Sequence, residues 1–249
     1  MIDPIEQFNI EKIFTIGHIG NQEIAFTNSS AYMFGSVAII ALLMIGGVAG
    51  KQLVPGRIQS MAELSYEFVA NTIRSTAGRE GMKFFPLVFS IFMLLAVSNI
   101  VGIIPYTFTI SSHIIVTAAL ALLVFCTVLV YGFYKNGLKF FKLFVPSGVP
   151  IVILPLVVAI EVISFLSRPV SHSVRLFANM LAGHITLKVF ASFVTMLGAF
   201  GFVGWLGAIL PLGLVVALTA LELLVAFLQA YVFTILTCIY INDAIHPGH

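Results

Sequence analysis

Charged side chains are scarce in this sequence of 249 residues: Asp, Glu, Lys and Arg make up 9% of it, against 60% hydrophobic residues. Soluble domains carry about 25% charged residues, so the composition excludes a soluble globular protein and predicts an integral membrane protein. Tryptophan occurs once and phenylalanine 23 times, which suits a surface that faces lipid. A net charge of +2 gives no reason to expect nucleic acid as a partner.

Motifs of soluble enzymes, metal sites and cofactor sites are also missing. The sequence contains no His-Glu-x-x-His, no nucleotide-binding glycine loop and no Cys-x-x-Cys. The two cysteines, Cys126 and Cys238, both lie in apolar runs, where we expect them to pack as small hydrophobic side chains. No basic region precedes an apolar core in the first 23 residues, so we expect no signal peptide. These N-terminal residues allow a short surface helix.

The apolar residues form runs of membrane-spanning length, since about 20 apolar residues cross the hydrocarbon of a bilayer. Ile24 to Gly50 carries no charge, and Asn28-Ser-Ser30 can cap a helix that begins near Ala31. Residues 84–134 are too long for one span and suit two, with a break at Pro105 to Ser112. The expected spans are 31–50, 84–105 and 113–134.

Most charges gather between these runs. Residues 51–83 carry five basic and three acidic residues, together with apolar residues at helical spacing: Ile58, Met61, Leu64 and Phe68. The pattern predicts an amphipathic helix at 57–78 along the membrane surface, with a soluble linker helix as the alternative. Residues 51–83 and 135–142 hold eight of the twelve Lys and Arg. Such loops stay in the cytoplasm, so we expect segment 1–30 outside and the C-terminus inside.

Residues 149–197 keep a helical pattern over about 70 Å, more than twice the thickness of the hydrocarbon. Pro146 and Pro150 mark a break before this segment. The segment itself either divides into two spans or lies strongly tilted. Pro155 and Pro169 can kink a membrane helix without ending it, and we favour one long helix. Gly198 to Pro211 is glycine-rich and predicts a turn, followed by a second long helix at 207–241. The predicted fold is an all-α integral membrane protein. Its single domain, 1–249, has about five membrane-embedded helices and an amphipathic surface helix, the last two helices forming a long, strongly tilted hairpin.

Ionisable side chains interrupt these last two helices. An arginine at the centre of a membrane helix costs roughly 2.5–3.5 kcal/mol on insertion scales, so Arg175 needs a partner or a task. At 100° per residue it shares a stripe with several polar residues: Glu161, Arg168, Ser171, His172 and Asn179. His184 lies on another face, and Glu222 and Gln229 share one face of the last helix.

These residue types favour ion handling. A carboxyl group and an imidazole beside an aqueous inlet can relay protons, whereas a guanidinium stays protonated and acts only through its charge. Arg175 would attract a carboxylate and repel an excess proton. Three alternatives stay open. Arg168 could simply reach the cytoplasmic interface. The chain could also be an ion-coupled secondary transporter in which Arg175 binds an anionic substrate, or a haem- or quinone-linked subunit that uses His172 and His184. The sequence lacks the internal repeats of many transporters and the usual histidine spacing of haem sites.

Two segments carry a resemblance to a known family, and a third supports it. They are Arg168-Pro-Val-Ser-His-Ser-Val-Arg-Leu-Phe-Ala-Asn-Met-Leu-Ala-Gly-His184, Leu228-Gln-Ala-Tyr-Val-Phe-Thr-Ile-Leu-Thr237 and Ser98-Asn-Ile-Val-Gly-Ile-Ile-Pro105. With them the chain resembles, over nearly its whole length, the subunit a family of the F-type ATP synthase (the ATPase subunit 6 family). Some bacterial members of this family carry an acid at the position of His184 and a histidine at the position of Glu222. This chain has the two residue types exchanged, and in this it is similar to mitochondrial relatives.

The resemblance implies a mechanism. A ring of c subunits would turn against the two long helices, and protons would reach and leave its carboxylates by two offset half-channels separated by Arg175. Asn179 and Gln229 would flank Arg175. His184 and Glu222 would share an inlet role, with the order of transfer open, and Glu161 and Ser171 would line the other path.

The resemblance also implies partners and a location. The partners would be the c-subunit ring, b-type peripheral stalk subunits, the F1 sector through the stalk, and the lipid bilayer. The chain would do no covalent chemistry and need no cofactor or metal. Its place would be the inner membrane of a bacterium, as a multi-pass protein with an extracytoplasmic N-terminus and a cytoplasmic C-terminus.

Overall fold

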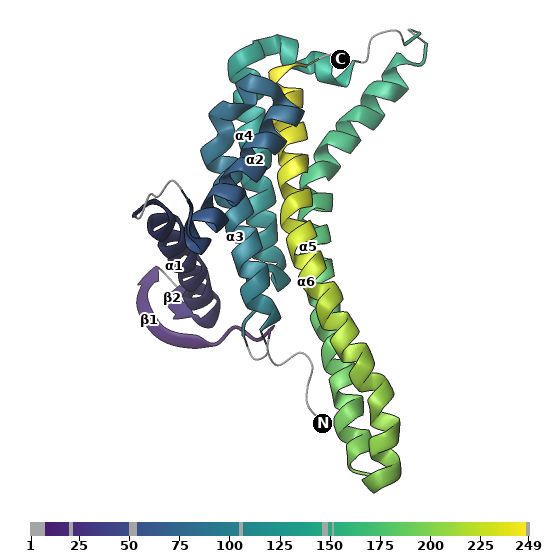
Figure 1. Cartoon of the computed structure of the whole chain (residues 1–249). Helices are drawn as coiled ribbons and strands as arrows, with labels where there is room; N and C mark the ends of the chain where they lie inside the picture. The colour runs from purple at the N-terminus through teal and green to yellow at the C-terminus, as the bar shows by residue number, and fades with distance from the viewer. Residues whose placement is uncertain are drawn as a thin grey trace. The chain divides into compact units, whose positions relative to one another are not determined.

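The computed structural model describes residues 8–19, 22–49, 54–104, 107–145, 149–150 and 152–247. The break residues Pro105 and Pro146 lie outside the described residues, as do residues 1–7. Two strands are followed by six α-helices in the described part of the chain (Figure 1). Their bounds are β1 (Lys12–Ile19), β2 (Gln22–Thr27), α1 (Asn28–Ala49), α2 (Arg57–Gly81), α3 (Phe85–Ile103), α4 (Ile114–Asn136), α5 (Leu154–Gly198) and α6 (Gly201–Ile245).

The all-α membrane fold is confirmed. Within the described residues five helical stretches are long and apolar enough to cross a membrane. They are Asn28–Ala49, Arg57–Ile103, Ile114–Phe144, Leu154–Gly198 and Gly201–Ile245. In the second of them α2 runs into α3 through the short 3-10 helix Met82–Phe84.

Residues Lys12–Ile19 and Gln22–Thr27 form a β-hairpin before the first span, so the short surface helix allowed in this region does not occupy these residues. β1 and β2 pair antiparallel, with Phe14 opposite Phe26 and their rings stacked at 5.0 Å. β-branched and aromatic residues fill both strands and favour a pleated pairing. Lys12 Nζ lies 2.5 Å from Glu23 Oε2, and this hydrogen bond and charge hold the pKa of the Glu23 carboxyl below its ordinary value.

α1 begins at Asn28, slightly before the expected start near residue 31. The amide of Ser30 donates to Thr27 Oγ1 at 3.4 Å, and the Asn28 side chain accepts from the amide of Ser29 at 2.8 Å. These side-chain oxygens satisfy amides that the first turn of a helix leaves without partners. Asn28 Oδ1 also accepts from the amide of Glu11, which ties the hairpin to the helix.

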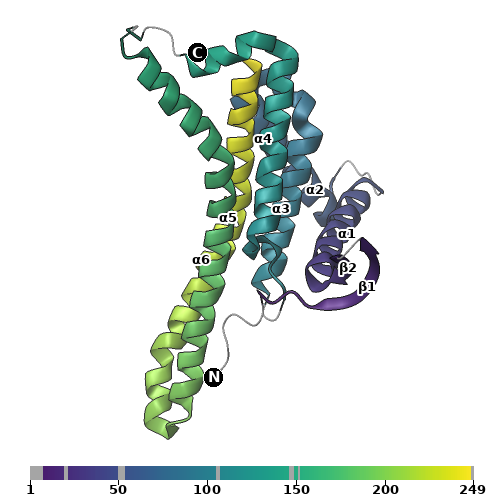
Figure 2. The same cartoon turned by 180° about the vertical axis from the view of Figure 1, so that it is seen from behind.

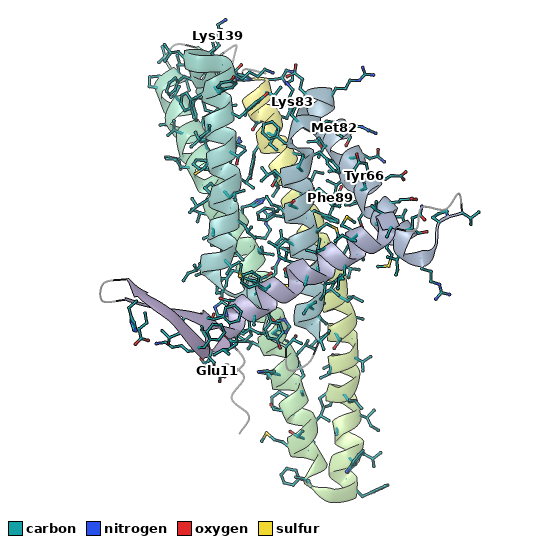
Figure 3. All side chains as sticks on the ribbon, turned by 90° about the vertical axis from the view of Figure 1, so that its left-hand side faces the viewer. Glu11, Tyr66, Met82, Lys83, Phe89 and Lys139 are labelled. Carbon is teal, nitrogen blue, oxygen red and sulfur yellow. The ribbon has the colours of Figure 1, made fainter. Side chains whose placement is uncertain are left out.

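α2 buries a different face from the one that its large apolar residues suggest. Its buried side consists of Ala62, Val69, Ala70, Thr72, Ile73, Ala77 and Gly81. Met61 and Leu64 of the predicted stripe are exposed. Tyr66 lies beside Phe89 of α3, with ring centroids 6.3 Å apart (Figure 3). Small residues allow close helix packing in membranes. The helix α2 therefore packs mainly through its small residues, and larger apolar side chains such as Met61 and Leu64 are exposed.

α5 is one continuous helix through Pro169, as favoured over a break into two spans. The predicted turn at Gly198 to Pro211 is wrong, because α6 already begins at Gly201 and contains Pro211. Gly201 takes a φ of 75°, which lets the chain reverse within two residues. α5 and α6 then run side by side and pack together (Figures 1 and 2).

The chain forms two compact units. The first consists of Met1–Ile40, Leu94–His113 and Leu176–Gln229. The second consists of Ala41–Met93, Ile114–Arg175 and Ala230–His249. The first unit therefore contains the part of the α5–α6 hairpin next to its turn, and the second contains the opposite ends of both helices. The site residues are described below unit by unit.

Candidate functional site

His184 of α5 and Glu222 of α6 meet in the interior of the first unit. His184 Nδ1 lies 3.6 Å from Glu222 Oε1. Both residues are buried, with 7% and 5% of their surface exposed. The distance is within ion-pair range but slightly long for a direct hydrogen bond. The structure thus brings together the acid and the imidazole that the sequence singled out from separate helices.

The carboxyl group of Glu222 rests against the backbone of α5. A Cβ atom placed on Gly183 would lie 2.7 Å from Glu222 Oε1, so a larger residue there would displace the carboxyl group from this position. Within the described part of the chain, neither oxygen of Glu222 accepts a hydrogen bond. A buried carboxyl group without donors is costly to ionise, which suits a group that holds a proton.

A buried threonine contacts the other nitrogen of His184. Thr109 Oγ1 lies 3.1 Å from His184 Nε2, and Thr109 is completely buried. The ring of Phe8 closes the site edge-on, with its centroid 6.3 Å from that of His184. The sequence analysis missed Thr109, because it belongs to the connection between α3 and α4 and no helical period links it to His184.

Asn99 also contacts α6. Its Nδ2 donates to the carbonyl oxygen of Ala226 at 3.3 Å, and its Oδ1 accepts from the hydroxyl of Ser111 at 2.5 Å. Ala226 lies between Glu222 and Gln229 along α6, so Asn99 fixes the part of that helix that carries both polar residues.

Asn179 and Gln229 form the next polar contact between α5 and α6. Asn179 Nδ2 donates to Gln229 Oε1 at 3.0 Å. Gln229 is buried, whereas Asn179 is exposed. The antiparallel helices therefore match their polar residues in register: His184 with Glu222, and Asn179 with Gln229 further from the turn.

Arg175 is exposed on α5, one helical turn from Asn179. Its neighbour Leu176 and also Met180 are completely buried, so the inward face of the helix is apolar here. The ion pairs in the described part of the chain do not include Arg175.

Comparison with known proteins shows the family of the chain. The family described as "ATP synthase A chain" matches residues 30–242. The chain belongs to this family. "ATP synthase subunit a" of Nitrobacter winogradskyi is 85% identical to it over the full length of both chains, and that of Nitrobacter hamburgensis is 83% identical, again over both full lengths. The Rhodopseudomonas palustris (strain BisB5) protein of the same name is 82% identical over 99% of each chain.

Membership of the ATP synthase A chain family settles the broad class. The chain is a non-catalytic, proton-translocating subunit of ATP synthase with several transmembrane helices. The relatives come from bacteria, and the chain is a multi-pass membrane protein of a bacterial ATP synthase. The secondary transporter and the haem- or quinone-linked subunit are thereby excluded.

The second arginine of α5, Arg168, differs from Arg175 in its surroundings. Arg168 Nη1 donates to Asp243 Oδ2 of α6 at 2.7 Å, and its guanidinium lies 4.9 Å from the ring centroid of Tyr240. Arg168 is therefore held by its own chain and does not simply reach an interface. Asp243 was missed by the sequence analysis, although the antiparallel register of the two helices would have indicated it.

The remaining predicted residues are less closely joined. His172 is buried, with its ring centroid 3.8 Å from that of Phe233. Glu161 is half-buried and Ser171 exposed, and neither side chain makes a hydrogen bond within the described part of the chain. A search of the described residues finds no group of three His, Cys, Asp or Glu that could hold a metal ion.

Proposed function

We propose that this chain is the stator of the membrane motor of ATP synthase and that Arg175 separates two offset half-channels for protons. The observation that carries the proposal is the contrast between the two arginines of α5. Arg168 has a carboxylate partner within the chain, whereas Arg175 is exposed and takes part in none of the chain's described ion pairs. A guanidinium placed in a membrane helix needs a counter-charge, so the partner of Arg175 is expected on another subunit.

A ring of c subunits, each with a carboxyl group at mid-membrane depth, would supply that counter-charge. An opposite charge nearby favours the ionised form of a carboxyl group. Each ring carboxyl would therefore release its proton when it reaches Arg175. Because a guanidinium cannot give up its own proton at physiological pH, no proton can pass directly through Arg175, and the two half-channels stay separate.

His184 and Glu222 would form the proton relay of one half-channel. The two nitrogens of an imidazole can take up and release protons at opposite edges of the ring. The 3.6 Å between His184 and Glu222, and their common burial, support transfer between them. The order of transfer stays open. Asn179 and Gln229 would flank Arg175 as polar helpers, since their hydrogen bond lies one turn along α5 from it.

Glu161 and Ser171 would line the second half-channel. Both lie on the opposite side of Arg175 from His184 along the continuous α5. Glu161 is about 21 Å from Arg175 along the helix axis at the standard rise per residue. Its partial exposure leaves the carboxylate accessible to protons from solution.

The proposal also assigns partners and orientation. The chain would contact the c-subunit ring, b-type peripheral stalk subunits, the F1 sector through the stalk, and the lipid of a bacterial inner membrane. Eight of its twelve Lys and Arg fall in residues 51–83 and 135–142, which favours the cytoplasm for both segments. The N-terminus would then be extracytoplasmic and the C-terminus cytoplasmic.

The test is ATP-driven proton pumping in inverted membrane vesicles that carry Arg175→Ala, with Arg175→Lys beside it. We expect acidification to disappear in Arg175→Ala while the complex still assembles, and passive proton conductance of the stripped membrane to persist or rise. Arg74→Ala, which removes an exposed arginine from α2, is the matched control and should pump normally. Near-normal pumping by Arg175→Ala would refute the assignment of Arg175 as the separator.

A further inference from the structure

Thr109 is placed between two acceptors in the interior of the first unit. Its Oγ1 lies 3.1 Å from His184 Nε2 and 3.3 Å from the carbonyl oxygen of Gly102. The residue has no exposed surface, and His184 is buried as well. A threonine hydroxyl has one proton to donate and two lone pairs that accept. It can therefore donate to either of these two partners, but only to one at a time.

When His184 is neutral, its Nε2 can accept the hydroxyl proton of Thr109. The ring proton is then on Nδ1, which faces Glu222 Oε1 at 3.6 Å. Both ring nitrogens have a polar neighbour in this state. In this arrangement the hydroxyl of Thr109 donates to Nε2, and the ring N–H is directed toward the carboxyl group.

When His184 is protonated, both ring nitrogens become donors. Nε2–H can then donate to Thr109 Oγ1, provided that the hydroxyl proton turns away. The carbonyl oxygen of Gly102 is in place to accept that proton. The Nε2–H of the imidazolium thus has an acceptor without any movement of the backbone. This matters because a buried donor without an acceptor is costly.

We propose that Thr109 is a positioning residue whose hydroxyl alternates between His184 Nε2 and the Gly102 carbonyl as His184 gains and loses its proton. This inference rests on the relay proposed for His184 and Glu222. The titratable groups that face His184 are Glu222 on α6 and Lys188 one turn further along α5. Because its hydroxyl can donate or accept, Thr109 provides a hydrogen bond to both protonation states of His184, and the bond to the charged imidazolium is the stronger one.

Gly102 gives this arrangement its space. A Cβ atom at Gly102 would lie 2.9 Å from Thr109 Cγ2 and 3.2 Å from Thr109 Oγ1. A side chain there would push Thr109 away from its position between the carbonyl and the imidazole. Gly102→Ala therefore disturbs the same contact from the opposite side and provides an independent variant.

The test compares Thr109→Val with Thr109→Ser in inverted vesicles that contain the complete ATP synthase. Valine keeps the size of threonine but lacks the hydroxyl, whereas serine restores it. ATP synthesis after an acid–base jump is measured per assembled complex, at several pH values of the vesicle lumen and a constant pH difference. We expect Thr109→Val to lower the initial rate about tenfold, because a hydrogen bond to a charged group is lost, and Thr109→Ser to restore most of it.

The pH profile separates proton handling from packing. Without the hydroxyl both states of His184 lose a hydrogen bond, but the imidazolium loses the stronger, charge-assisted one. The profile of Thr109→Val should therefore move toward lower lumenal pH by about one unit. Gly102→Ala should move it in the same direction. The control is Thr117→Val, since Thr117 is equally buried but donates only to the carbonyl of Ile114 in its own helix. Its rate and profile should match the parent.

Two outcomes would overturn the inference. A parental rate and profile in Thr109→Val would show that the hydroxyl is not needed, and a loss that Thr109→Ser does not rescue would show that only packing matters. Glu222→Gln distinguishes these failures from a failure of the proposed function. If Glu222→Gln abolishes ATP synthesis and Thr109→Val does not change it, only the inference about Thr109 is wrong. If Glu222→Gln retains full activity, the relay itself is wrong.

Discussion

Gly183 of α5 and Glu222 of α6 are in such close contact that a side chain at position 183 would have to displace the carboxyl group. A Cβ atom at Gly183 would lie 2.7 Å from Glu222 Oε1 and 3.4 Å from Cδ. The glycine therefore determines how closely the carboxyl group approaches α5, and with it the 3.6 Å between that group and the neighbouring His184. One small residue in the first long helix thus sets the geometry of an acid in the second.

Gly183→Ala is predicted to reduce proton pumping strongly while the complex still assembles. The added methyl group displaces the Glu222 carboxyl from His184, and inserting a methyl group into a packed interior costs about 1–3 kcal/mol. Pumping in inverted vesicles and the amount of assembled complex are measured together. Gly213→Ala is the control, because a Cβ atom at Gly213 in α6 meets nothing within 4 Å. Equal pumping by the two variants would contradict the contact described here.

Asn179 and Gln229 are predicted to act as one unit. Their hydrogen bond of 3.0 Å is lost when either side chain is removed, so Asn179→Ala and Gln229→Ala should each lower the pumping rate. The double variant should lose little more than the worse single variant, with a coupling of about 1 kcal/mol, or roughly fivefold in rate. Asn71→Ala on the exposed side of α2 should instead combine additively with Gln229→Ala. Additive losses for Asn179 and Gln229 would show that their bond has no role in transport.

The polar residues of α5 and α6 could be predicted from the sequence because ionisable groups are conspicuous among apolar ones. Arg175, His184 and Glu222 stand out for this reason, and helical periodicity together with an antiparallel turn indicated that the stripes could meet. Thr109 and Asp243 could not be found in the same way. Thr109 comes from a connection whose course is decided by tertiary packing, and Asp243 lies near the end of α6, where charged residues need no special explanation.

Other differences come from the nature of membrane packing. Lipid is as apolar as a protein core, so large apolar residues in a membrane protein do not mark the buried face of a helix. For this reason Met61 and Leu64 of α2 are exposed, while Ala62 and Ala70 are buried. The glycine-rich segment misled for another reason. Gly204 lies within α6, and a Cβ atom there would lie 2.0 Å from the carbonyl oxygen of Leu197, so the glycine allows the close approach of the two helices at their turn.

Gly132→Ala is predicted to destabilise the second unit. A Cβ atom at Gly132 in α4 would lie 2.3 Å from Cε2 of the fully buried Phe140. Because the ring has no free space to move into, we expect a loss of about 1–3 kcal/mol in the free energy of unfolding. The measurement is the temperature at which the detergent-solubilised complex loses this subunit. Gly35→Ala in α1, where a Cβ meets nothing within 4 Å, should leave that temperature unchanged or raise it. A parental temperature for Gly132→Ala would disprove the tight packing.

The last prediction concerns Arg168 and Asp243. A variant with both residues replaced should be more stable than the single variant Asp243→Asn. Their side chains form a 2.7 Å ion pair with about a quarter of each exposed, and Phe165 and Tyr240 lie against the guanidinium. Asp243→Asn leaves the charge of Arg168 without its counter-charge in a partly apolar place, which should lower stability by about 1 kcal/mol after allowing for solvent screening. Adding Arg168→Gln removes the unpaired charge and should restore most of the loss. Thermal dissociation of the complex is compared for both single variants, the double variant and the parent. If Asp243→Asn is as stable as the parent, or the double variant is weaker still, the pair does not stabilise the helices through its charges.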